Sequence, residues 1–174
     1  MTTLPEPDDH ARCLPPIVTP KTRLLILGSL PGRRSLAVQQ YYAHPRNQFW
    51  RLIGEVVGID LAKLPYERRL EQLVAHNIGL WDVIGEATRP GSLDTSITSA
   101  VPNDLGTLLS GLPMLNAIAF NGQTASRLGR HQMSLGTLPA TVNALLDLPS
   151  SSPAYTLSYV EKARSWHALR ECIG

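Results

Sequence analysis

Three segments of the sequence place polar and aromatic residues directly after short apolar runs. The first run is followed by the turn GSLPG at 28–32 and then by the block YYAHPRNQFW at 41–50. The next two segments are Asn121-Gly122 and LPSSSP at 148–153. All are rich in Gly, Pro, Ser, Asn or Tyr, and none contains a carboxylate. A pocket built from them would be rigid, neutral to basic and aromatic, which suits a flat polar ring.

Motifs for several other kinds of chemistry are absent. The sequence has no GxxxxGK[ST] phosphate loop, no GxGxxG dinucleotide fingerprint and no GxSxG nucleophile elbow. The five histidines show no metal-ligand spacing, and the two cysteines, Cys13 and Cys172, are too few for a four-cysteine zinc or iron–sulfur site. We therefore expect neither a metal ion nor a cofactor.

Alternating strands and helices are predicted to bring the three segments to one edge of a sheet. Short apolar runs predict buried strands at 23–28, 78–84, 117–120 and 144–148. Helical periodicity or position predicts helices at 47–58, 66–76, 102–110, 123–131 and 156–172. This order predicts an α/β fold, a three-layer αβα arrangement around a four-stranded parallel sheet. Ligands of such sheets bind beyond the carboxyl ends of the strands.

Length and composition fit one globular domain. The chain has 174 residues, 43% hydrophobic and 17% charged, which excludes a disordered, coiled-coil or fibrous protein. Residues 1–20 hold five prolines and are predicted to form an extended arm before a single domain over 21–174. No apolar run approaches the roughly 20 residues of a membrane span, and no signal-peptide layout is present. We expect a cytoplasmic monomer without a membrane partner.

Positive charge is concentrated in one part of the chain. No acidic residue occurs between Asp9 and Glu55, a stretch with seven Lys and Arg residues. A second acid-free stretch runs between Asp104 and Asp147. Such segregation is typical of proteins that bind a phosphate backbone, and it also arises by chance on a solvated surface.

The segments GSLPG, YYAHPRNQFW, FNG and LPSSSPAY, in this order, resemble the motifs of the uracil-DNA glycosylase superfamily. The resemblance covers about residues 22–172 and is closest to the hypoxanthine-DNA (deoxyinosine) glycosylase branch. Leu30 stands where mismatch-specific uracil glycosylases carry Asn and major uracil glycosylases carry Asp. Leu148 stands where the major enzymes carry His. The resemblance implies a DNA repair enzyme that hydrolyses the N-glycosidic bond of a deaminated base and leaves an abasic site. Hypoxanthine is the base that we expect it to release.

The resemblance also assigns roles to individual residues. Asn47 matches the catalytic Asn of the HPxN segment, and its amide would orient a water molecule beneath C1′. Tyr42 would stack on the extruded base, while backbone N–H groups of the first turn would bind its carbonyl. The expected base-binding residues are Gly28, Ser29, Leu30, Pro31, Tyr42 and Asn121. The expected DNA-binding residues are Arg33, Arg34, His44, Arg46, Ser150, Ser151, Ser152 and Pro153.

The same residues have structural explanations. Asn47 is also a candidate helix N-cap, Asn121 a turn former and Tyr42 a core aromatic. Three functions stay open: a monofunctional deaminated-base glycosylase, a uracil or mismatch-specific glycosylase, and a catalytically silent DNA-binding module on the same fold. No lysine lies in the matching motifs to form a Schiff base, so we expect no lyase step.

Overall fold

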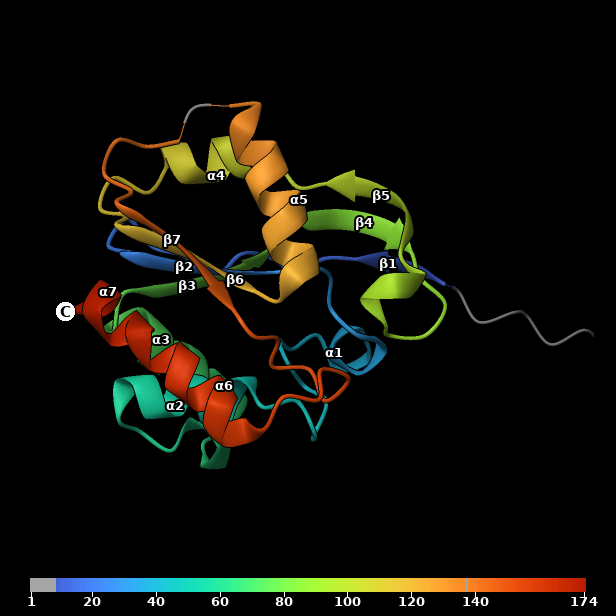
Figure 1. Cartoon of the computed structure of the whole chain (residues 1–174), viewed down its shortest axis with the longest axis horizontal. Helices are drawn as coiled ribbons and strands as arrows, with labels where there is room; N and C mark the ends of the chain where they lie inside the picture. The colour runs from blue at the N-terminus through green and yellow to red at the C-terminus, as the bar shows by residue number, and fades with distance from the viewer. Residues whose placement is uncertain (1–8, 137) are drawn as a thin grey trace, which may run out of the picture.

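The computed structural model describes residues 9–136 and 138–174. At its centre lies a parallel sheet with the strand order β3-β2-β6-β7. The four strands are β2 (Leu24–Gly28), β3 (Ile78–Asp82), β6 (Ala117–Asn121) and β7 (Ala144–Leu148). Helices lie on both faces of this sheet (Figure 1). The predicted three-layer α/β fold with a four-stranded parallel sheet is therefore confirmed.

The central strands are apolar because the sheet is covered on both faces. Alternate residues of β2 belong to two different buried clusters, Leu24 and Ile26 to one and Leu25 and Leu27 to the other. The first cluster packs against α2 (Phe49–Val57), α3 (Tyr66–Ala75), α6 (Tyr159–Trp166) and α7 (Arg170–Ile173). The second packs against α4 (Leu105–Ser110) and α5 (Gln123–Ser134).

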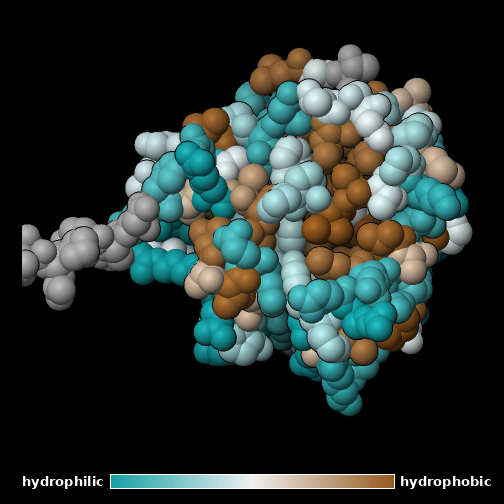
Figure 2. Space-filling model, turned by 180° about the vertical axis from the view of Figure 1, so that it is seen from behind, coloured by the Kyte–Doolittle hydropathy of each residue, from teal (hydrophilic) through white to brown (hydrophobic). Residues whose placement is uncertain are grey.

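Apolar side chains also reach the surface in places. Seen from behind, hydrophilic residues cover much of the molecule, and apolar side chains gather in a patch right of centre (Figure 2). The two buried clusters therefore hold most, but not all, of the large apolar side chains. Among the described residues, no helix is both long and apolar enough to cross a membrane.

Several elements differ from those predicted. The apolar run at 78–84 divides, because the chain leaves the central sheet after Asp82 and β4 (Ile84–Thr88) belongs to a second sheet. That antiparallel sheet has the order β1-β4-β5, with β1 (His10–Arg12) and β5 (Thr98–Pro102). All five residues of β5 are exposed, and its sequence has no alternation of apolar and polar residues that would predict a strand. The short helix α1 (Arg33–Val38) was also not predicted.

The first part of the chain packs on the domain from residue 9 onward. Strand β1 pairs with β4, Ile17 forms a bridge with Leu80, and Leu14 lies in the first apolar cluster. Residues 1–8 of the predicted arm lie outside the described residues.

The carboxyl ends of the four parallel strands meet at one edge of the sheet. The register pairs Gly28 with Asp82 and Asn121 with Leu148. Helix α1 and the loop that follows β7 lie beyond this edge (Figure 1). The three polar segments identified in the sequence therefore converge here.

Candidate active site

The turn that follows β2 is held by residues of the loop after β4. Ser29 Oγ donates a hydrogen bond of 2.7 Å to Asp94 Oδ1. The Arg89 guanidinium donates to the carbonyl oxygens of Leu30 and Pro31. Arg89 is only 2% exposed, so both bonds are shielded from water. These contacts, between residues about 60 positions apart, fix the shape of the predicted base-binding turn.

Within this turn, the Leu30 side chain is buried in the protein. The Leu30 side chain is 6% exposed and packs in the second apolar cluster. A contact between Leu30 and a base would therefore use its main chain, as the predicted role of the turn N–H groups requires.

Tyr42 lies directly over the end of β2. Its ring stacks on Phe49 with 3.9 Å between centroids and 16° between planes. A Cβ atom added to Gly28 would lie 2.9 Å from the Tyr42 hydroxyl oxygen and 2.6 Å from Asp82 Oδ1. Glycine is therefore needed at position 28, where two polar side chains approach the backbone. Phe49 covers one face of the tyrosine ring, and Tyr42 as a whole stays partly exposed.

Asp82 brings a buried carboxyl group to this site. It is 4% exposed, and its Oδ2 atom has no hydrogen-bond partner among residues 9–136 and 138–174. Burial, followed by the charge of Asp94, raises the pKa of Asp82 to about 7, and the charge of Arg89 opposes this rise. The three segments identified in the sequence contain no carboxylate, and Asp82 reaches their edge of the sheet because β3 lies next to β2 and pairs Asp82 with Gly28.

This carboxyl group makes stability depend on pH. The pKa of Asp82 rises from the ordinary aspartate value of 3.8 to about 7, so the folded protein retains a proton that the unfolded chain releases between these values. The group therefore opposes folding more strongly as the pH rises. Asp82→Asn is expected to change the free energy of unfolding little at pH 4 and to raise it by on the order of 2 kcal/mol at pH 8.

Urea unfolding at both pH values measures this effect. Asp147→Asn is the matched control, since the hydrogen bond from Ser126 lowers the pKa of Asp147 and reverses the expected sign. A gain for Asp82→Asn that is equal at pH 4 and pH 8 would show that Asp82 does not titrate in this range.

Asn121 joins the end of β6 to the loop after β7. Its Nδ2 donates to Ser151 Oγ at 2.9 Å, and the Ser151 N–H donates to Asn121 Oδ1 at 2.9 Å. Gly122, with φ of +99°, lets the chain turn against Ser150. Burial, then the charge of Asp82, raises the pKa of Tyr42, and a side-chain hydrogen bond with Asn121 opposes this rise. Tyr42, Asn121 and Ser151 thus form one connected group.

Asn47 lies in a tight turn immediately before α2. Its N–H donates to the His44 carbonyl oxygen at 2.9 Å, and its Oδ1 accepts from the Phe49 N–H at 3.0 Å. The helix N-cap is Gln48, one residue later than predicted, and Gln48 makes no side-chain cap bond. Asn47 therefore satisfies a free N–H of the first helical turn and at the same time has its amide plane held in place.

The turn with Asn47 contacts the loop with the three serines. The Gln48 N–H donates to the Ser151 carbonyl oxygen at 3.0 Å. Since Ser151 is paired with Asn121, this bond links Asn47 to the group formed by Tyr42, Asn121 and Ser151. The structure thus brings together all the predicted base-binding segments and the predicted catalytic residue.

The predicted DNA-binding residues differ in exposure. Arg34, Arg46, His44 and Pro153 are exposed, and Ser150 and Ser152 are partly so. Ser151 is 1% exposed, so its part is to hold the loop. His44 Nδ1 accepts the Arg46 N–H at 3.1 Å. Arg33 is paired with Asp9 at 2.8 Å, whereas no ion pair with another described residue engages Arg34 or Arg46.

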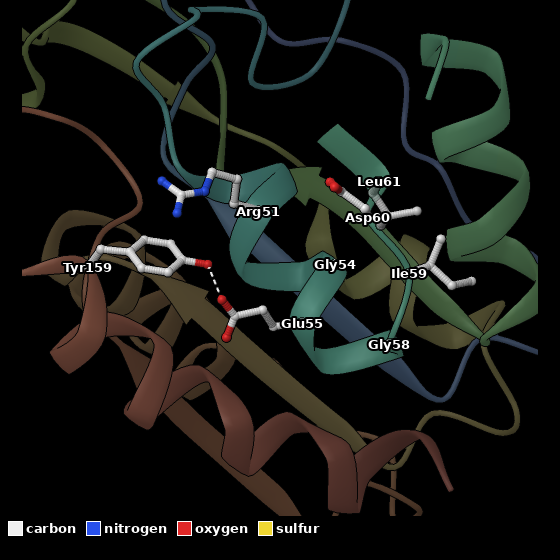
Figure 3. Close-up of a pocket in the computed structure, with 8 residues that line it drawn as sticks. All are labelled: Arg51, Gly54, Glu55, Gly58, Ile59, Asp60, Leu61 and Tyr159. Atoms are coloured by element: carbon white, nitrogen blue, oxygen red, sulfur yellow. Dashed lines mark hydrogen bonds between the residues drawn. The ribbon is translucent and has the colours of Figure 1, made fainter. Parts of the chain in front are cut away.

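A separate pocket of about 340 Å³ lies at the other end of α2 (Figure 3). The Tyr159 hydroxyl donates to Glu55 Oε1, and the Arg51 guanidinium lies 4.0 Å from the centre of the Tyr159 ring. None of the predicted site residues lines this pocket. Through these contacts, Arg51, Glu55 and Tyr159 join α2 to α6.

Comparison with known proteins places the chain in a family. Residues 15–170 match the family model of the uracil DNA glycosylase superfamily. The chain belongs to the uracil-DNA glycosylase superfamily. The family predicted from the sequence motifs is therefore confirmed.

Two relatives in this superfamily bear the name hypoxanthine DNA glycosylase. The protein from Methanosarcina barkeri is 39% identical over 152 residues, which cover 87% of this chain and 92% of the relative. The protein from Methanosarcina acetivorans is 37% identical over 158 residues, or 91% and 96% of the two chains. A solution NMR structure from M. acetivorans, provisionally assigned as a uracil DNA glycosylase, matches with a TM-score of 0.79 and 36% identity, covering 92% and 96% of the two chains.

Three residues of this uracil-DNA glycosylase superfamily member were missed by the sequence analysis. Asp82 lies inside the strand predicted at 78–84, so its place at the end of β3 was not visible in the sequence. Arg89 lies in a predicted loop, and no pattern indicates that its side chain turns inward. Lys162 lies four residues before Trp166 on the buried face of α6, where a lysine is normally taken as solvated.

Proposed function

We propose that this protein is a DNA glycosylase that hydrolyses the N-glycosidic bond of a deaminated base, hypoxanthine in deoxyinosine, and leaves an abasic site. The observation that carries the proposal is the strand-end group in which Asn47 lies next to the linked residues Tyr42, Asn121 and Ser151. The names of the two relatives, over nearly the whole chain, support hypoxanthine as the base.

Bond cleavage leaves a sugar with oxocarbenium character and a base that departs as an anion. The barrier falls when the enzyme stabilises that anion and positions water beneath C1′. An amide cannot act as a general base, so Asn47 orients the water. The hydrogen bond from the Phe49 N–H leaves the second lone pair of Asn47 Oδ1 and both Nδ2 protons for this purpose.

The base must leave the DNA stack before this reaction can occur. Tyr42 stacks on the extruded base with the ring face that Phe49 does not cover. Main-chain N–H groups of the turn at 28–32 bind the base carbonyl, and Asn121 holds the neighbouring loop against the pocket. The bonds from Arg89 and to Asp94 keep this turn preorganised.

Contacts to the DNA backbone come from the exposed positive charges around the site. Arg34 and Arg46, which are exposed and form no ion pair with a described residue, bind phosphates, and Arg33 exchanges its contact with Asp9 for one with DNA. The loop at 150–153 is fixed by Ser151, and its exposed Pro153 presses against the DNA double helix.

The proposal predicts simple hydrolysis. Incubation with deoxyinosine DNA should release free hypoxanthine, measured by chromatography, and borohydride should trap no covalent protein–DNA adduct. Among the described lysines, Lys162 makes contact with the site loops, and it is 1% exposed with its ammonium bonded to two oxygens. A trapped adduct that disappears in Lys162→Met would instead reveal a lyase step.

A further inference from the structure

Lys162 lies beneath the site, between the two segments that face DNA. Its Nζ donates to Gln48 Oε1 at 3.0 Å and to the Ser152 carbonyl oxygen at 3.1 Å. Gln48 follows Asn47 directly, and Ser152 belongs to the loop after β7. One side chain from α6 therefore binds both the turn that carries Asn47 and the loop that presses on DNA.

The bonds of Lys162 reinforce a second contact between the same two segments. The Gln48 N–H donates to the Ser151 carbonyl oxygen, so main chain and side chain of Gln48 are both bound. Ser151 in turn is held by Asn121. Without Lys162 the turn would be attached to the loop at this point by a single backbone hydrogen bond.

A buried ammonium group is unfavourable for folding at this position. Lys162 is 1% exposed, and no carboxylate among the described residues forms an ion pair with it. Its neighbours are two neutral oxygens and the Tyr155 ring, 5.6 Å from Nζ. Burial lowers the pKa of Lys162 accordingly. An apolar side chain would fill this space at lower cost in desolvation, so the group serves something other than packing.

We propose that Lys162 is a positioning residue that locks the Asn47 turn to the loop at 150–153, so that the catalytic amide and the DNA contacts keep one fixed arrangement. This inference rests on the proposed glycosylase function. It requires no contact between Lys162 and the substrate. The effect on the reaction comes through Gln48 and the placement of Asn47 beneath C1′.

The variant Lys162→Met separates positioning from packing, because methionine keeps most of the volume and removes the donor. The single-turnover rate constant for excision from deoxyinosine DNA should fall roughly 10-fold to 100-fold, the cost of a small misplacement. The Kd for DNA with a non-hydrolysable 2′-fluoro deoxyinosine should change by no more than about threefold. Lys63→Met is the control, since Lys63 is an exposed lysine paired with Asp60, and it should leave both values unchanged.

A double-variant cycle tests the route through Gln48. If Lys162 acts by holding Gln48, then Gln48→Leu combined with Lys162→Met should be about as slow as the slower single variant. If the rate losses of the two single variants multiply in the double variant, this route through Gln48 is contradicted.

Hydrogen exchange tests the lock without relying on activity. In Lys162→Met the amide protons of Gln48 and Ser151 should exchange faster, while those of Ile26 and Ile118 in the central sheet stay protected. Unchanged exchange at Gln48 would overturn the proposal, even if the wild-type protein excised no base. An unchanged excision rate with a lowered midpoint of thermal unfolding would overturn it as well, because Lys162 would then only stabilise the fold. If the wild-type protein excises no base from deoxyinosine DNA, that result counts against the proposed function instead.

Discussion

Asn47→Ala is expected to slow excision of hypoxanthine by roughly 100-fold to 1000-fold, the usual cost of removing one preorganised polar group from an active site. The amide of Asn47 is held by the Phe49 N–H, directly beside the segment that Ser151 and Asn121 fix. Without it the water beneath C1′ loses its orientation. Single-turnover kinetics with excess enzyme on a deoxyinosine duplex measures the effect.

The hydrogen bond that Asn47 accepts from the Phe49 N–H, in the first turn of α2, must be separated from catalysis. Asn47→Ser keeps an oxygen that can accept the N–H of the first helical turn. This variant should therefore be more stable than Asn47→Ala, while its excision of hypoxanthine should be as slow. Asn143→Ala removes an exposed asparagine outside the site and should leave excision unchanged. Recovery of excision in Asn47→Ser would mean that Asn47 acts only through its hydrogen bond to the first turn of α2.

Arg89→Met is expected to lower the free energy of unfolding by roughly 3–5 kcal/mol. The variant leaves the buried carbonyl oxygens of Leu30 and Pro31 without their donor. It also removes the positive charge nearest to Asp82 and Asp94. Urea unfolding monitored by tryptophan fluorescence measures the loss.

Arg12→Met is the matched control for this prediction. Arg12 lies in β1 and pairs with Glu86 of β4, the strand that Arg89 directly follows, but the Arg12 side chain is 76% exposed. The control should therefore change the free energy of unfolding by less than about 1 kcal/mol. Equal losses in both variants would show that the buried bonds of Arg89 contribute nothing beyond a surface ion pair.

The central sheet could be predicted because its two inner strands, β2 and β6, are buried on both faces. The run LLIL at 24–27 is apolar throughout, and AIAF at 117–120 has the same character. The second sheet lacked this signal, since β5 is exposed along its whole length and β1 has three residues. Short exposed strands are specified by their partners, and a partner is not visible in the local sequence.

Site residues were predicted where a sequence motif marks them. They were missed where only tertiary packing brings their side chains to the site. Asn47, Tyr42 and Asn121 were assigned from motifs, and the structure brings them together. Asp82 was overlooked, because only the strand order places β3 beside β2. Lys162 was read as part of an amphipathic helix, and nothing in its neighbours indicates that its amine turns toward Gln48.

The most direct test of the account compares deaminated bases in otherwise identical DNA. End-labelled duplexes that carry one deoxyinosine, deoxyuridine or deoxyxanthosine are incubated with the wild-type protein, and abasic sites are then cleaved with alkali. The account predicts strand cleavage at deoxyinosine, and its loss with Asn47→Ala. Cleavage of the uracil duplex alone would contradict the assignment of hypoxanthine. Binding of all three duplexes without cleavage of any would contradict the glycosylase function itself.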